Sequence, residues 1–147
     1  MKHHPVTILV VDDDDGHLEL VQRNLRRAGL ANSIVVAQDG KAALDFVFGD
    51  ETRAVHPADT LLVLLDINMP GGIDGIEVLR RLKSDPRTHK VPVIMLTTTD
   101  DPREVARCYD LGCSVYITKP VDPQRFVDAI QRLGLFLSIV TVPSVED

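Results

Sequence analysis

Residues 60–70 read TLLVLLDINMP, in which five consecutive apolar residues, 61–65, end abruptly on Asp66. A run of that length is too short for a typical helix and too apolar for a strand with one face in solvent. It is typical of a strand covered on both faces, as in a parallel sheet. A carboxylate at the end of such a buried segment needs partners, which other parts of the chain must supply.

Short apolar runs, mostly aliphatic or β-branched, recur along the chain at residues 8–11, 34–37, 93–96 and 115–117. Segments with apolar residues at helical spacing lie between and after them. Asp39, Asp101-Pro102 with Glu104, and Asp122-Pro123 are start signals of helices, and Gly29 and Gly112 stand where helices could end. The pattern therefore predicts five strands that alternate with five helices.

Strict alternation of strand and helix predicts an α/β fold, a doubly wound parallel sheet with helices on both faces. The 147 residues and 44% hydrophobic content suit one domain, assigned to residues 1–147. In such folds, reactive groups gather outside the carboxyl ends of the strands. The residues that follow each strand are therefore the candidates for a functional site.

Composition excludes several classes of protein. The net charge of -6 argues against nucleic-acid binding, because phosphate backbones are held mainly by Lys and Arg. Cys108 and Cys113 have no metal-ligand spacing and are interpreted as reduced thiols. The N-terminus does not match a signal peptide, and no segment approaches the ~20 apolar residues of a membrane helix. We expect a cytoplasmic protein without a membrane segment.

The residues just past the predicted strands are Asp12 and Asp13, Asp66, Thr97 and Lys119. Three carboxylates at one sheet edge repel each other by about 4 kcal/mol per pair at ~4 Å and an effective dielectric of ~20. Mg²⁺ would offset this repulsion, since it binds one or two carboxylates and keeps water and phosphate oxygens as its other ligands. Each residue alone could be a helix cap, a local hydroxyl or a turn lysine; their joint placement is the specific signal.

A carboxylate beside Mg²⁺, a hydroxyl donor and a lysine can attack phosphorus, because phosphoryl transfer depends mainly on alignment and on charge stabilisation. Asp66 would be the nucleophile and would form an aspartyl phosphate. Thr97 and Lys119 would each hold a phosphoryl oxygen.

Four blocks of the sequence, ILVVDDDD (8–15), LLDINMPGGIDG (64–75), VIMLTTTD (93–100) and YITKP (116–120), resemble the signature blocks of the receiver domain of two-component response regulators. The blocks follow the family's order, and the resemblance covers about residues 6–135. It implies the flavodoxin-like, CheY-like (βα)5 fold with strand order 2-1-3-4-5. The loop GGIDG is one residue longer than the common pattern, which leaves the approach of Asp74 and Gly75 to the site open.

The resemblance also implies roles for individual residues. Asp12, Asp13 and Asp66 would bind Mg²⁺ with the backbone carbonyl of Asn68, and Asp66 would accept phosphate from a phosphohistidine of a sensor histidine kinase. Thr97 and Tyr116 match the family's switch pair, in which the threonine moves toward the phosphoryl group and the aromatic ring turns inward. The Lys119-Pro120 bond is expected to be cis.

After the fifth predicted helix the chain has only residues 136–147 as a C-terminal extension, so we expect output through protein contacts. The segment LGLFLSIVTVP (133–143) is unusually apolar. It either folds back on its own domain or, as we prefer, forms a homodimer contact. The expected contact residues are Phe126, Leu133, Phe136, Leu137 and Ile139.

The long polar loop at 49–59 and the apolar extension are similar to those of single-domain receivers that serve phytochrome-type histidine kinases. This narrower resemblance implies a bacteriophytochrome as the kinase, and a downstream phosphotransfer protein stays open. Two alternatives remain. A phosphohydrolase of the haloacid dehalogenase type would need an acid two residues after the nucleophile, where this chain has Asn68. A degenerate receiver would bind partners without phosphorylation.

Overall fold

The computed structural model describes residues 6–27, 31–49, 61–69 and 71–119, together with Gln124 and Asp128. In chain order the elements are β1 (Thr7–Val11), α1 (Asp15–Arg27), β2 (Ile34–Ala37), α2 (Gly40–Phe48), β3 (Leu61–Leu65), α3 (Gly75–Ser84), β4 (Val93–Thr97), α4 (Pro102–Leu111) and β5 (Val115–Thr118). The predicted alternation is confirmed. Of the expected fifth helix only Gln124 and Asp128 are described, and both are helical.

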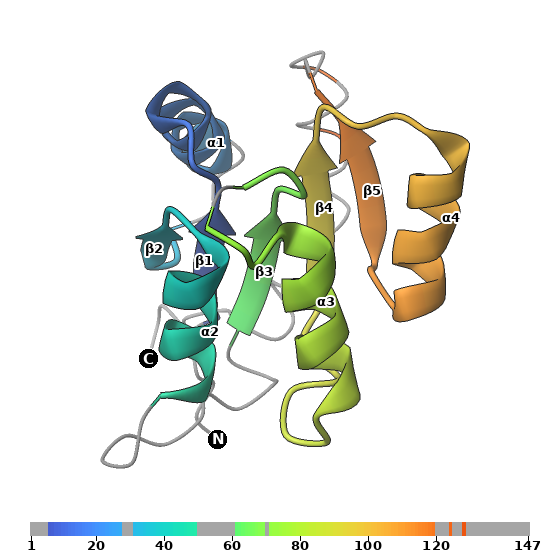
Figure 1. Cartoon of the computed structure of the whole chain (residues 1–147). Helices are drawn as coiled ribbons and strands as arrows, with labels where there is room; N and C mark the ends of the chain where they lie inside the picture. The colour runs from blue at the N-terminus through green and yellow to red at the C-terminus, as the bar shows by residue number, and fades with distance from the viewer. Residues whose placement is uncertain are drawn as a thin grey trace.

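The five strands form one parallel sheet in the order β2-β1-β3-β4-β5 (Figure 1), as the resemblance implied. Val11 pairs with Leu65, so the residues that follow them, Asp12 and Asp66, leave the sheet at the same level. Thr97 pairs in the same way with Thr118. The register therefore brings the carboxyl ends of β1, β3, β4 and β5 to a common edge.

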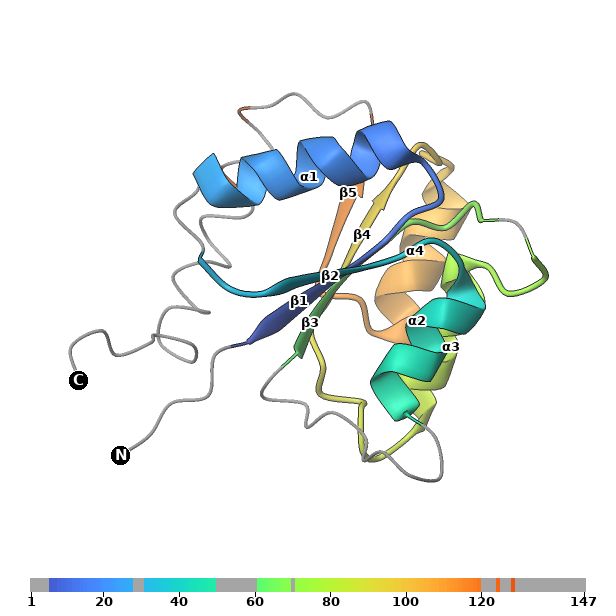
Figure 2. The same ribbon diagram turned by 90° about the vertical axis from the view of Figure 1, so that its left-hand side faces the viewer.

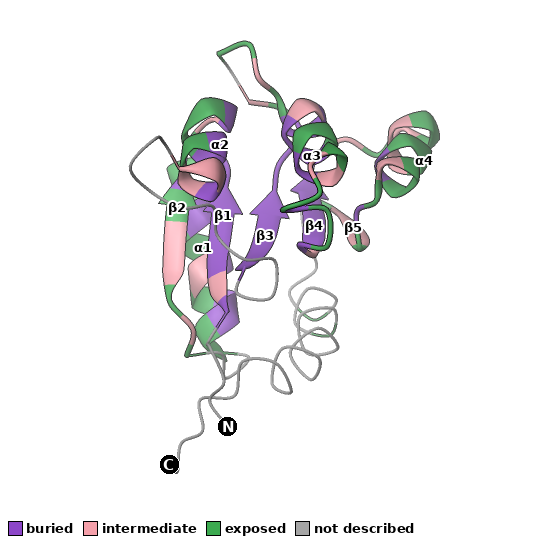
Figure 3. Cartoon of the chain, turned by 90° about the horizontal axis from the view of Figure 1, so that it is seen from below, coloured by how far each residue is buried: buried purple, intermediate pink, exposed green. Residues whose placement is uncertain are grey.

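Each face of the sheet packs against its own helices. Figure 2 shows α1 on one face and α2, α3 and α4 on the other. Alternate strand residues divide accordingly, since Ile8 and Val10 belong to the cluster with α1 while Leu9 and Val11 belong to the cluster with α2 and α3. Every residue of β3 and β4 is buried (Figure 3), which explains their continuous apolar runs.

Two strands run one residue further than their apolar patterns predicted, to Thr97 and Thr118. Apolarity marks the buried length of a strand, whereas the ladder is defined by backbone pairing, and these two threonines still pair with each other. The extension keeps Thr97 rigid within the sheet and fully buried.

Aspartates begin three of the helices; the caps at Asp39 and Asp101 were predicted, and the cap at Asp74 was not. Asp39 accepts a hydrogen bond from the N–H of Ala42, Asp74 from Glu77, and Asp101 from Arg103. Glu104, the acid of the start signal at α4, lies in the first turn of that helix, and its Oε1 is buried without a hydrogen-bond partner in the described part of the chain. Gly112 ends α4 in the left-handed conformation.

Among the described residues, no helix has the length and apolar character needed to cross a bilayer.

Candidate functional site

Three carboxylates lie together at the carboxyl edge of the sheet. Asp12 and Asp66 are 3% and 7% exposed, and Asp13 is exposed. One carboxylate oxygen of each lies within 4.8 Å of the others. The predicted grouping is therefore present, with two of the three acids withdrawn from solvent.

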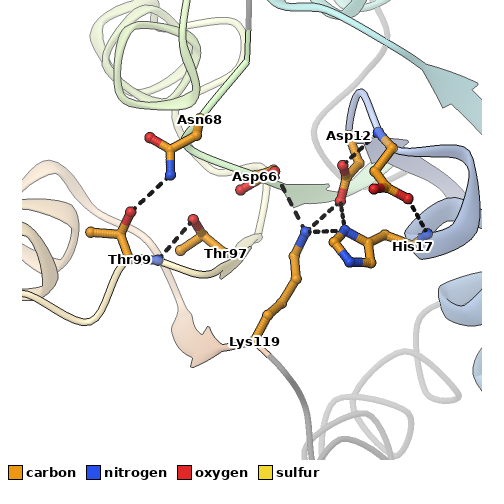
Figure 4. A network of polar contacts seen from close by, with 8 residues as sticks. Asp12, His17, Asp66, Asn68, Thr97, Thr99 and Lys119 are labelled. Carbon is orange, nitrogen blue, oxygen red and sulfur yellow. Dashed lines mark hydrogen bonds and ion pairs between the residues drawn. The ribbon is translucent and has the colours of Figure 1, made fainter.

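Lys119 supplies a cation to this cluster. Its Nζ lies 2.7 Å from Asp12 Oδ2 and 3.5 Å from Asp66 Oδ2, and the residue is 8% exposed (Figure 4). Its backbone N–H donates to the carbonyl of Thr97, which fixes the start of this side chain against β4. A single ammonium thus neutralises part of the charge of two buried carboxylates.

Asp66 is the least satisfied member of the cluster. Its Oδ1 is buried and has no hydrogen-bond partner among the residues that the structure describes. A buried, unpaired carboxylate oxygen is costly, and a hard divalent cation with two neighbouring carboxylates is the partner that this donor set fits. The residues present therefore fit Mg²⁺ or a similar ion.

The β3–α3 loop fits closely beneath Asp66. The N–H of Gly75 donates to the carbonyl of Ile67 at 2.8 Å, and a Cβ on Gly75 would lie only 2.0 Å from the Asp66 carbonyl oxygen. Asp74, whose approach to the site was open, instead caps α3. Gly71 and Gly72 have φ of 95° and 90°, so the longer loop is accommodated by two left-handed glycines.

A second set of polar contacts connects the site with β5. Asn68 Nδ2 donates to Thr99 Oγ1 at 3.0 Å, and the hydroxyl of Tyr116 donates to the Thr99 carbonyl. The Thr97 hydroxyl accepts from the N–H of Thr99 at 3.4 Å. The two members of the expected switch pair, Thr97 and Tyr116, therefore meet at Thr99.

Tyr116 is held inward by these contacts. Its ring packs against the core cluster, and burial is the main reason that the pKa of its hydroxyl is raised to about 12. The hydroxyl is consequently protonated and available as a donor at neutral pH.

The sequence analysis missed three residues of this region: His17, Thr99 and Tyr109. His17 lies beside Lys119, at 2.9 Å between Nδ1 and Nζ, and Tyr109 accepts a hydrogen bond from Tyr116. None of them follows a strand directly, so the rule that selected the other site residues could not reach them. The available signal was the place of His17, five residues after Asp12 and third in the first helix.

Other expectations fall on residues that are not described. These are the cis bond at Lys119-Pro120, the helix end at Gly29, the helix start at Asp122-Pro123, the dimer contacts at Phe126, Leu133, Phe136, Leu137 and Ile139, and the extension 136–147. They stay predictions.

Comparisons with known proteins agree with this geometry. The family model described as "Response regulator receiver domain" matches residues 8–131. Response regulator Rcp1 of Synechocystis is 32% identical over 143 residues, which cover 95% of each chain. The solved structure of its Mn²⁺-bound form has 31% identity and a TM-score of 0.74, and covers 90% of this chain and 94% of that one.

Two further solved structures are similar over nearly the whole chain. A response regulator receiver domain from Rhodospirillum rubrum is 50% identical with a TM-score of 0.79, covering 94% of this chain and 97% of that one. The phosphorylated cyanobacterial phytochrome response regulator RcpA is 30% identical with a TM-score of 0.74, covering 90% and 94%. From its motifs, its sheet order and these matches, the chain belongs to the response regulator receiver domain family.

Proposed function

We propose that Asp66 of this two-component receiver domain accepts a phosphoryl group from a phosphohistidine of a sensor histidine kinase. The observation that carries the proposal is the state of the Asp66 carboxylate, which is buried, lies beside two acids and an ammonium, and has no partner for Oδ1 among the described residues. A nucleophile needs an oxygen that is not already hydrogen-bonded, in a pocket that tolerates added negative charge.

The metal in this proposal is Mg²⁺, held by Asp12, Asp13 and Asp66 with the backbone carbonyl of Asn68. When bound, it would offset the charge on the carboxylates and on the phosphoryl oxygens. The carboxylate oxygens within 4.8 Å of one another support this ligand set.

In the transfer, an Asp66 oxygen forms a bond to phosphorus while the P–N bond to the kinase histidine breaks. The electron pair of that bond stays on the imidazole nitrogen, which takes a proton from solvent. Lys119 and Thr97 would each hold one of the phosphoryl oxygens, Lys119 through its ammonium and Thr97 through its hydroxyl. The chain would catalyse only its own phosphorylation and dephosphorylation.

The signal would pass from Asp66 to β5 through Thr97 and Tyr116. The Thr97 hydroxyl that bonds the Thr99 N–H would turn to the phosphoryl group, and this change would alter the loop whose carbonyl holds Tyr116. The face of α4 and β5, with the helix expected after it, is the surface that a partner would contact.

The kinase is proposed to be a bacteriophytochrome, because the cyanobacterial phytochrome response regulator RcpA matches 90% of this chain. Because such a kinase phosphorylates itself with ATP, we expect this chain to act in the cytoplasm. A downstream phosphotransfer protein is compatible with this role. Nucleic acid is not among the proposed partners, given the net charge of -6.

Homodimerisation through the apolar extension is the last part of the proposal. Light scattering should give a dimer mass for the full chain and a monomer mass for a chain truncated after Arg132. An unchanged dimer mass on truncation would remove the extension from the explanation.

Intact-mass spectrometry after incubation with acetyl phosphate and Mg²⁺ tests the central step. The full chain should gain one phosphoryl group, and Asp66→Asn should gain none, because the amide is no nucleophile. Asp45→Asn, on the exposed side of α2, is the matched control and should be phosphorylated like the parent. Equal labelling of Asp66→Asn would falsify the assignment.

Two measurements separate the alternatives. A catalytic amount of a haloacid dehalogenase-type enzyme would turn over p-nitrophenyl phosphate. A degenerate receiver would gain no mass in the acetyl phosphate experiment. The geometry favours neither, since Asn68 donates to Thr99 where the enzyme would need an acid.

A further inference from the structure

His17 lies beside Asp12, at the solvent-accessible side of the carboxylate cluster. It belongs to the first turn of α1, where its backbone N–H donates to Asp14 Oδ1 at 3.0 Å. This bond also lowers the pKa of the Asp14 carboxyl. The imidazole is 41% exposed, and its Nδ1 lies 2.9 Å from Lys119 Nζ and 3.6 Å from Asp12 Oδ2 (Figure 4). The side chain thus reaches from α1 to the lysine whose ammonium lies between His17 and Asp66.

The contact with Lys119 defines the state of the ring. An ammonium only donates hydrogen bonds, so His17 Nδ1 must accept, and the neutral ring then carries its proton on Nε2. His17 is therefore an uncharged acceptor for Lys119, next to the charged acceptor Asp12.

The ammonium is shared unequally among its three acceptors. Its distances are 2.7 Å to Asp12 and 2.9 Å to His17, but 3.5 Å to Asp66 Oδ2. Asp66 Oδ1 has no partner among the described residues. Lys119 thus makes short contacts with Asp12 and His17 and only one longer contact with the Asp66 carboxylate.

We propose that His17 is a positioning residue that holds Lys119 against Asp12 and so prevents the ammonium from closing on Asp66 before phosphoryl transfer. This inference rests on the proposed function of Asp66. A carboxylate oxygen that already accepts a short bond from an ammonium has part of its charge withdrawn and is the poorer nucleophile. Keeping Lys119 at 3.5 Å preserves the reactivity of Asp66.

The hold is weak enough to be released. A neutral imidazole competes poorly with the charged oxygens of a phosphoryl group, because charge-assisted hydrogen bonds are the stronger ones. Once phosphorus is bonded to Asp66, Lys119 is drawn toward the new negative charge. His17 thus acts on the unphosphorylated protein and has little effect on the product.

The direct test is the ¹³Cγ chemical shift of Asp66, recorded by NMR in the metal-free, unphosphorylated full chain. In His17→Ala the ammonium should move onto Asp66 and shift this signal. In His17→Asn the signal should stay as in the parent, because the amide oxygen stands close to the position of Nδ1. His89→Ala, an exposed histidine in the α3–β4 loop, is the matched control and should leave the signal unchanged.

The second readout is the phosphorylation rate with acetyl phosphate and Mg²⁺. His17→Ala should be slowed roughly tenfold, the scale of one hydrogen bond to a charged group, and His17→Asn should recover most of the parental rate. The dephosphorylation rate should change much less in both variants. A structural defect alone would not be repaired by asparagine.

The outcomes separate the two proposals. An Asp66 signal in His17→Ala identical to that of the parent overturns the positioning role, whether or not phosphorylation occurs. A shifted Asp66 signal in His17→Ala, together with a parent chain that acetyl phosphate does not label, would leave the role of His17 intact and refute Asp66 as the acceptor. Slowing in both His17→Ala and His17→Asn also counts against positioning.

Discussion

The hydroxyl of Tyr109 on α4 accepts a hydrogen bond from the backbone N–H of Tyr116 on β5, at 3.0 Å. In the sheet order, β5 is the last strand, so one side of its backbone has no neighbouring strand among the described residues. The tyrosine hydroxyl takes the place of a strand carbonyl there. Since Cys108 is the only buried residue of α4, this bond is one of few specific attachments of the helix to the sheet.

Tyr109→Phe should loosen the contact between α4 and β5. The variant keeps the ring but leaves the Tyr116 N–H without its partner, which costs about 1 kcal/mol. Amide hydrogen exchange at Tyr116 should therefore quicken about fivefold. Ile117, one residue further along β5, serves as the internal control and should keep its rate.

Thr97→Ala should separate phosphorylation from the response of Tyr116. Asp66 and Lys119 remain, so acetyl phosphate should still label the protein. The hydroxyl that would sense the phosphoryl group is gone, so the ¹H NMR signals of the Tyr116 ring should change less on phosphorylation than in the parent. Thr118→Ala is the matched control, because Thr118 is exposed and pairs with Thr97 across the sheet; its Tyr116 signals should respond to phosphorylation as in the parent. A parental response in Thr97→Ala would contradict the switch.

The sequence predicted the sheet and the charged part of the site well, for one physical reason. A buried parallel strand needs a continuous apolar run, and the first polar residue after it is forced to the carboxyl edge. Asp12, Asp66 and Thr97 obey this rule, and Lys119 follows one residue later, directly after the end of β5 at Thr118. The register places the ends of these strands together.

The rule fails for residues that reach the site from a helix or a loop. His17 and Tyr109 lie on helices, and Thr99 meets Asn68 only because two loops are adjacent. Their side-chain directions depend on helix packing rather than on local sequence pattern.

Gly75→Ala should destabilise the fold and distort the acceptor. The new Cβ would lie 2.0 Å from the Asp66 carbonyl oxygen and 2.7 Å from Ile67 Cα, both backbone atoms that cannot move aside cheaply. We expect a loss of about 1–3 kcal/mol in the free energy of unfolding by urea, together with slower phosphorylation. Gly16→Ala on α1 meets only the flexible end of Asp14 and should stay within about 1 kcal/mol of the parent.

The two thiols should make stability fall at alkaline pH. Cys108 and Cys113 are free and buried, as the reduced-thiol interpretation expected, and burial raises the pKa of each from 9.0 to about 11. Above the unfolded value the unfolded chain loses these protons while the folded chain keeps them. The free energy of unfolding therefore decreases as the pH rises from about 9 to about 11.

Urea unfolding at about pH 8 and about pH 10 measures this loss. The double variant Cys108→Ala/Cys113→Ala should lose less stability between the two pH values than the parent, although it is less stable at both because it leaves cavities. Burial is the main cause of the raised pKa of Tyr116, and this part is common to both proteins; the smaller part that comes from the two thiols is lost with them and acts in the same direction as the expected difference. Equal pH dependence in the two proteins would mean that the folded thiols ionise as readily as unfolded ones, which their burial in the core argues against.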